Sequence, residues 1–136
     1  MRSRIEVMSL ADGLTGAVYQ TDELIEAPNW LPDGTGLIFN GSGHLYRLHF
    51  DSCEVSPVDT GFAVRCNNDH GISADGKRLV ISDHTETGQS QIYTLPVAGG
   101  NPEKVTRNKP SYWHGWSPDG QTLAYCAERS GRYDIY

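Results

Sequence analysis

The stretch GWSPDG at residues 115–120 decides the fold, because two related stretches precede it at regular intervals. They are NWLPDG at residues 29–34 and GISADG at residues 71–76, which place the three Asp-Gly pairs 42 and 44 residues apart. An Asp-Gly pair favours a tight turn, since glycine has no Cβ and adopts positive φ angles freely. A turn that returns about every 43 residues predicts a repeated structural unit.

The residues around each Asp-Gly pair repeat as well. One apolar side chain stands three residues before the aspartate, and two more stand four and six residues after it. The last two share one face of a β-strand, whereas no segment shows the apolar spacing of a helix. Each repeat is therefore predicted to form four short antiparallel strands. The apolar positions are Trp30, Ile72 and Trp116, then Leu37, Leu79 and Leu123, then Phe39, Ile81 and Tyr125.

Sheets of this kind predict a β-propeller, because a single four-stranded sheet cannot bury both faces and radial stacking of such sheets does. The expected fold is all-β, with about three four-stranded antiparallel blades. An open half-ring would expose sheet faces and unpaired edges, so we expect either a longer natural chain or a homodimer that closes a six-bladed ring. The expected division is residues 1–22 as strands three and four of one blade, 23–61 as the second blade, 62–107 as the third, and 108–136 as the first strands of another.

Composition excludes several classes of protein. The 136 residues carry a net charge of −6 and no run of Lys or Arg, so we expect no nucleic-acid partner. No apolar run approaches the ~20 residues of a membrane span. The three cysteines form no CxxC pair, which argues against a disulfide framework or a zinc site. Residues 1–7 lack the apolar stretch of a signal peptide, which favours the cytoplasm, or the periplasm if a leader is missing.

The candidate ligand site lies on the innermost strands, which line the central channel of a propeller. His70 and His114 each stand five residues before the aspartate of an Asp-Gly pair, so we expect them side by side near the axis. Histidine beside carboxylate and amide groups suits a polar ligand, and these two are the only candidate metal ligands. The alternative is that both histidines hydrogen-bond neighbouring strands and hold blades together. The expected site is Glu26, Asn29, Asn68, Asp69, His70, Trp113 and His114.

Other features are expected to be structural. Trp30 and Trp116 repeat in register with Ile72 and are predicted to lie in the core. Residues 83–86, Asp-His-Thr-Glu, could be taken for an acid–base pair but are predicted to form a solvated loop. The chain has no G-x-S-x-G, P-loop or HExxH motif, so we predict no catalytic residue and no cofactor.

The stretches NWLPDG and GWSPDG resemble the W-S-P-D-G core of TolB-like, WD40-like propeller repeats, although the middle copy lacks its Trp and Pro. QIYTLPVAGG at residues 91–100 is similar to the I-Y-x-M-D-x-x-G-G strand and turn of the same family. The resemblance implies a closed ring and a non-catalytic scaffold that binds a protein, peptide or small polar ligand at the ring face or channel. Two alternatives stay open: the gating propeller of a prolyl-oligopeptidase-like serine peptidase whose hydrolase domain is absent here, and a channel-metal propeller enzyme acting on acidic sugars.

Overall fold

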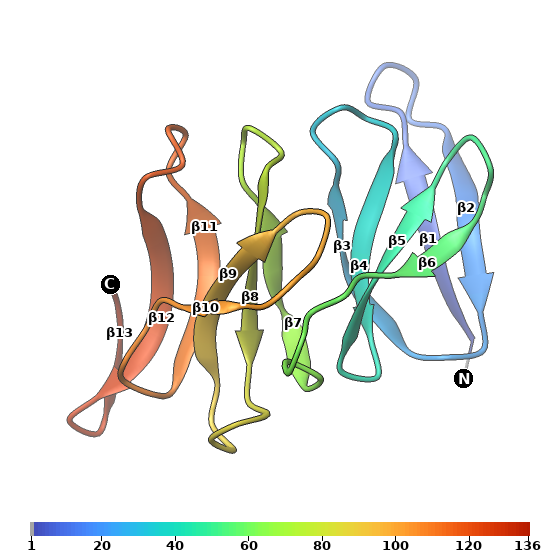
Figure 1. Cartoon of the computed structure of the whole chain (residues 1–136). Coiled ribbons are helices and arrows are strands. Elements are labelled where there is room, and N and C mark those ends of the chain that lie inside the picture. Colours follow the sequence, from blue (N-terminus) through green and yellow to red (C-terminus); the bar gives the residue numbers. More distant parts are fainter. Residues whose placement is uncertain (1) are drawn as a thin grey trace.

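The chain forms four antiparallel sheets that follow one another in sequence order (Figure 1). The computed structural model describes residues 2–136, and within them it contains strands and no helix. The first sheet is a hairpin of β1 (Ser3–Met8) and β2 (Thr15–Thr21). The second sheet has four strands, which are β3 (Ile25–Trp30), β4 (Gly36–Gly41), β5 (His44–His49) and β6 (Val55–Pro57).

The third and fourth sheets repeat this order. The third contains β7 (Cys66–Ile72), β8 (Arg78–Asp83), β9 (Gln91–Pro96) and β10 (Glu103–Lys104). The fourth contains β11 (Ser111–Trp116), β12 (Leu123–Arg129) and β13 (Arg132–Ile135). The first strands of successive sheets, β3, β7 and β11, lie next to one another, with β7 between the other two. The predicted all-β class, with antiparallel propeller blades, is confirmed.

The three Asp-Gly turns have the same hydrogen bonds, which explains their sequence repeat. The NH of each glycine (Gly34, Gly76 or Gly120) donates to the carbonyl three residues earlier, at 2.8–2.9 Å. These glycines have φ of 74°, 71° and 69°, a region that disfavours residues with a Cβ. In each pair only the glycine has a positive φ, and the aspartate does not. Each aspartate instead accepts hydrogen bonds from the residues beside it, which lower the pKa of its carboxyl group.

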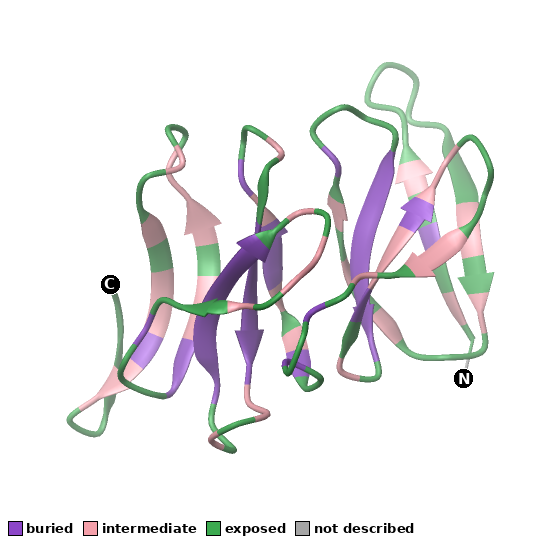
Figure 2. Cartoon of the chain, in the orientation of Figure 1, coloured by how far each residue is buried: buried purple, intermediate pink, exposed green. Residues whose placement is uncertain are grey.

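Buried residues concentrate on the second and third sheets (Figure 2), and apolar side chains form a cluster on each face of the second sheet. One cluster joins the second and third sheets through residues such as Ile38, Leu45, Ile81 and Tyr93, each at most 2% exposed. A smaller cluster joins the β1–β2 hairpin to the opposite face of the second sheet. The second sheet therefore buries both of its faces, which is the physical reason for stacking.

Two expectations about buried side chains are wrong. Trp30 is 52% exposed and contacts Phe50 edge-on, while Trp116 is only partly buried, with the Arg78 guanidinium over its ring. Both residues lie at the ends of their strands, where the neighbouring blade covers less of the side chain. Asp83, expected in a solvated loop, is 1% exposed. Its carboxylate accepts three hydrogen bonds from protein groups, which stabilise the buried charge.

Candidate functional site

Each of the three inner strands leaves its ladder at a comparable place. Strand β3 bulges at residues 27–28, β7 at residues 67–69 and β11 at residue 114. A bulge leaves residues without ladder partners and redirects their side chains, and such bulges are common beside binding sites. Because β3, β7 and β11 are neighbours, the three bulges lie on adjacent strands at the inner surface of the blades, and those of β7 and β11 carry polar side chains.

Asp69 and His114 occupy the centre of this surface. The Asp69 carboxylate accepts a hydrogen bond from the Asn67 amide at 3.1 Å, and its backbone NH donates to the Asn67 side-chain oxygen at 2.9 Å. Partial burial raises the pKa of the Asp69 carboxyl group, although the charge of His114 and the Asn67 bond oppose the rise. The imidazole of His114 is exposed. A half-buried carboxylate beside an exposed imidazole can bind a ligand that both donates and accepts hydrogen bonds.

His70 does not join His114 at this surface. Its side chain is 1% exposed, and neither ring nitrogen has a hydrogen-bond partner among the described residues. Burial lowers the pKa of the imidazole to about 4, although nearby backbone groups of Ile38, Asn67 and Ala27 partly oppose the effect. The difference from the expected pair arises because His114 is the bulged residue of β11, whereas His70 is back in the ladder opposite Ile81.

Burial of a neutral His70 predicts acid sensitivity. Lowering the pH from 7 to 5 should reduce the free energy of unfolding by about 2 kcal/mol through this residue alone. The ordinary pKa is 6.5 and the folded value is about 4, so between them the unfolded chain binds a proton that the folded chain does not. Stability is therefore complete above pH ~6.5 and falls as the pH approaches ~4.

Urea unfolding at pH 7 and pH 5 measures this effect. His70→Leu should be less sensitive to acid than the parent protein. Equal pH dependence in the parent and His70→Leu would show that the buried imidazole does not carry the effect.

The remaining expected site residues divide between surface and framework. Glu26 and Asn68 are exposed on the inner strands and can reach a ligand. The amide of Asn29 donates to the carbonyl of Ala27 at 2.9 Å and of His70 at 3.2 Å, so it links β3 to β7. Trp113 is half-buried with its ring against Gly71 of β7. Its backbone NH donates to the Ser82 hydroxyl at 2.9 Å, which places it in the joint between blades.

The sequence prediction missed two members of the polar surface. The Asn67 amide holds Asp69 in place by donating a hydrogen bond to its carboxylate. Burial is the main cause of the raised pKa of the Tyr112 phenol, and the nearby charge of Asp69 adds to the rise. Both residues directly precede predicted ones, but only the bulges reveal that they share the surface. Within residues 2–136, no three His, Cys, Asp or Glu side chains are grouped closely enough to hold a metal ion. The same residues contain no helix long and apolar enough to cross a membrane.

Comparison with known sequences gives several relatives, including the following two, while no family model matches the chain. An uncharacterised protein of Agrobacterium fabrum is 54% identical over 138 residues, covering all of this chain and 47% of that protein. The Tol-Pal system protein TolB of Desulfosudis oleivorans is 42% identical over 53 residues, covering 38% of this chain and 12% of that protein. The chain thus spans about half the length of the first relative.

Solved structures give the same picture. A candidate TolB from Agrobacterium tumefaciens has a TM-score of 0.97 and 53% identity, covering all of this chain and 50% of that one. TolB from Acinetobacter baumannii has a TM-score of 0.79 and 16% identity, covering 98% of this chain and 34% of that one. The tricorn protease has a TM-score of 0.64 and 14% identity, covering 91% of this chain and 13% of that one. The last two likenesses concern the fold alone.

The stacked antiparallel sheets with adjacent first strands define a segment of a β-propeller. More specifically, the chain is a segment of a TolB-like β-propeller, as the repeat motifs indicated. The comparisons do not support the expected cytoplasmic location.

Proposed function

We propose that this chain is part of a non-catalytic TolB-like scaffold that binds a segment of a partner protein at the inner surface of the blades. The observation that carries the proposal is the row of bulges on β3, β7 and β11, which leaves residues outside the ladders and, on β7 and β11, brings polar side chains to adjacent strands. A bulged strand with a carboxylate and an exposed imidazole beside it suits an extended peptide segment, which offers NH and carbonyl groups at regular spacing.

The comparisons suggest which partner to test. One relative is named a Tol-Pal system protein, so a Pal-type envelope protein is the first candidate, with the periplasm as the proposed location. The alternative is that the same surface binds a small polar ligand. A homodimer that closes the ring is a separate proposal, tested by the mass of the protein in solution. Neither the peptidase nor the sugar-cleaving alternative gains support from a particular contact among the described residues.

The test is calorimetric titration of the full-length protein with the Pal protein of the same organism. Asp69→Asn and His114→Ala should each raise the dissociation constant about tenfold or more, since each removes a hydrogen bond to a charged or polar partner. The melting temperature should change little, because both side chains lie at the surface rather than in the core.

Glu103→Gln is the matched control, because it neutralises an exposed carboxylate on β10, the outer strand of the blade that carries Asp69. It should bind as the parent does. Equal binding by the parent, Asp69→Asn and His114→Ala would reject the inner surface as the site. A large loss of stability in the two variants would instead assign these side chains to the framework.

A further inference from the structure

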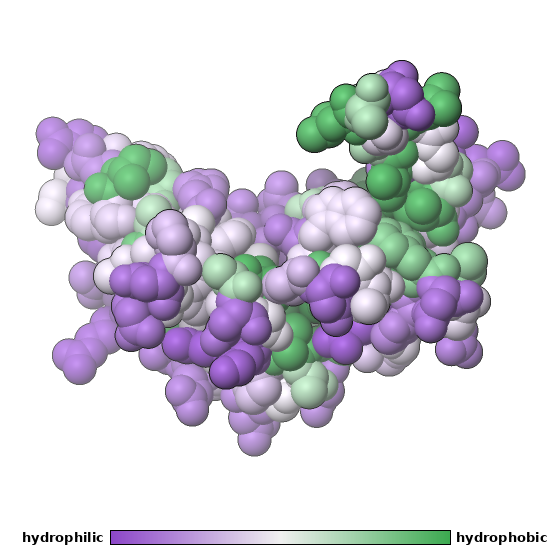
Figure 3. All heavy atoms as spheres, turned by 90° about the horizontal axis from the view of Figure 1, so that it is seen from above, coloured by the Kyte–Doolittle hydropathy of each residue, from purple (hydrophilic) through white to green (hydrophobic). Residues whose placement is uncertain are grey.

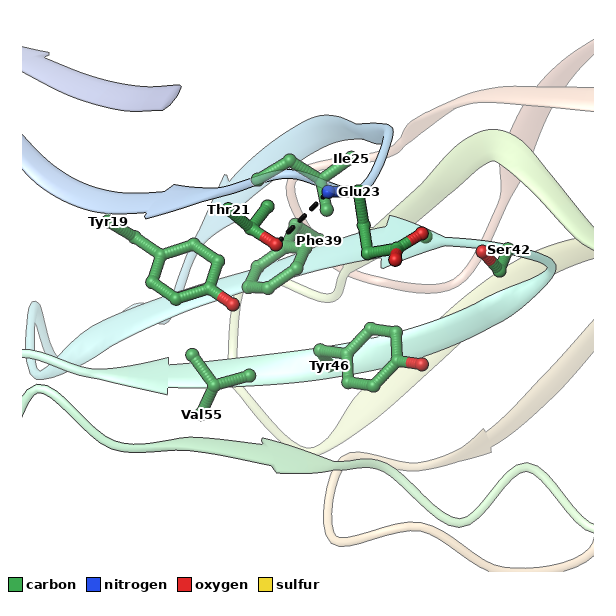
Figure 4. A pocket seen from close by; sticks show the side chains of 9 residues that line it. Tyr19, Thr21, Glu23, Ile25, Phe39, Ser42, Tyr46 and Val55 are labelled. Carbon is green, nitrogen blue, oxygen red and sulfur yellow. Dashed lines mark hydrogen bonds between the residues drawn. The ribbon is translucent and has the colours of Figure 1, made fainter. Parts of the chain in front are cut away.

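A pocket of about 260 Å³ lies between the β1–β2 hairpin and the second sheet, and its lining includes none of the bulged residues of the inner strands. Figure 4 shows its aromatic lining, with Tyr19 on β2, Phe39 on β4 and Tyr46 on β5. The ring centroids of Tyr19 and Phe39 are 5.6 Å apart, and those of Phe39 and Tyr46 are 5.7 Å apart. Phe39 is 2% exposed and forms the base, while the two tyrosines are half-buried at its sides.

The repeat explains why this pocket is open. Thr21, Thr60 and Thr106 each follow the fourth-strand segment of a repeat, and the residues two positions later are Glu23, Phe62 and Asn108. In the third sheet the Phe62 ring packs edge-on against Tyr93, with centroids 5.4 Å apart. Tyr46 of the second sheet corresponds to Tyr93 of the third. Tyr46 pairs with Phe39 and Tyr93 pairs with Ile81, and these partners follow their Asp-Gly pairs at the same distance. Glu23 therefore stands where the next blade has a phenyl ring.

The carboxylate of Glu23 gives the pocket its charge. Glu23 is exposed, and within residues 2–136 it forms no ion pair. No Lys or Arg lines the pocket, and Glu23 is the only acidic side chain in its lining. Figure 4 shows the carboxylate reaching toward Tyr46 near Ser42, while the amide of Glu23 donates to the Thr21 hydroxyl at 3.2 Å. This bond fixes the start of the loop that carries the acid.

Aromatic faces beside one unpaired carboxylate favour an organic cation. The negative face of an aromatic ring attracts an ammonium group, more strongly where water is partly excluded, and a carboxylate adds direct attraction. The volume is below the roughly 300–1,000 Å³ of pockets for drug-sized ligands, so a head group or a single side chain fits better than a large molecule. A methylated ammonium group has both the positive charge and the apolar surface that this lining matches.

We propose that this pocket binds a methylated ammonium group, presented by a small molecule or by a modified lysine side chain of a peptide. The site is separate from the proposed inner surface, and the two can be tested apart.

The first experiment titrates the full-length protein with choline and with 3,3-dimethyl-1-butanol, the neutral molecule of the same shape. Choline should bind at least fivefold more tightly, because only the charged head group gains the ring and carboxylate attraction. Equal binding of the two, or no binding of choline, would overturn the proposal. A tripeptide with a central trimethyl-lysine identifies the source: tighter binding than choline indicates a peptide, and weaker binding indicates a small molecule.

Variants locate the site. Glu23→Gln should weaken choline binding several-fold, and Glu23→Phe should abolish it by supplying the ring that Phe62 provides in the next blade. The melting temperature of Glu23→Phe should equal or exceed that of the parent. This result would show that binding is lost because the pocket is filled and not because the protein is misfolded. Glu54→Gln, an exposed acid between β5 and β6 that does not line the pocket, should bind choline as the parent does. Parental binding by Glu23→Phe would show that the cation binds elsewhere.

Discussion

Replacing Gly71 with alanine is expected to lower the free energy of unfolding by about 3 kcal/mol, as inserting a methyl group into a packed joint does. A Cβ at this position would lie 2.6 Å from Cζ3 and 2.9 Å from Cζ2 of Trp113, and closer still to Cη2. The backbone NH of Trp113 is bound to the Ser82 hydroxyl at 2.9 Å, which holds β11 against β8, so the clash must displace the indole or break this contact. The clash therefore separates β7 from β11, the two strands that bring Asp69 and His114 together.

Chemical unfolding of the Gly71→Ala variant measures the loss. Gly16→Ala is the matched control, since Gly16 also lies in a strand, has no positive φ, and a Cβ there would meet nothing within 4 Å. It should change stability by less than about 1 kcal/mol. Combining Gly71→Ala with Trp113→Leu should cost less than the sum of the two single changes, because the smaller side chain leaves room for the methyl group. Additive effects would show that the two residues do not share the joint.

The sequence was sufficient for the architecture, because the architecture repeats. Each Asp-Gly turn uses glycine at a backbone conformation that other residues disfavour. The strands after the first two turns each bury two apolar residues, and the strand after the third half-buries two. These constraints act locally and recur in every blade, so spacing alone reveals them. The two strands that flank each of the three Asp-Gly turns follow from this pattern.

The details of the inner surface could not be predicted in the same way. His70 and His114 have the same distance from an Asp-Gly pair, yet one is buried in the ladder and the other is exposed in a bulge. A bulge that begins a few residues earlier changes the direction of every side chain after it. Bulge positions depend on contacts with the neighbouring blade, and those contacts are not visible in the spacing of residues. The open pocket at Glu23 is different, because the change from phenylalanine to glutamate at one repeat position is present in the sequence.

The second large effect is expected at Asp83. Replacing it with alanine should lower the free energy of unfolding by about 4 kcal/mol, because three hydrogen bonds to one buried carboxylate are lost together. The carboxylate accepts from the Arg65 amide at 2.8 Å, the Thr85 amide at 2.8 Å and the Thr85 hydroxyl at 3.0 Å. These bonds fasten the segment entering β7 to the turn that leaves β8. Their loss therefore loosens the blade at the start of its inner strand.

Denaturant unfolding and amide hydrogen exchange together test this role of Asp83. Asp83→Asn should cost about half as much as Asp83→Ala, since one oxygen still accepts a hydrogen bond while the amide nitrogen faces a donor. Glu86→Ala, three residues away, should cost less than about 1 kcal/mol, because its ion pair with Lys104 is exposed. In Asp83→Ala the amides of Arg65 and Thr85 should exchange faster than those of the Asp119-Gly120 turn. If all amides accelerate equally, the carboxylate stabilises the blade as a whole and does not fasten this junction in particular.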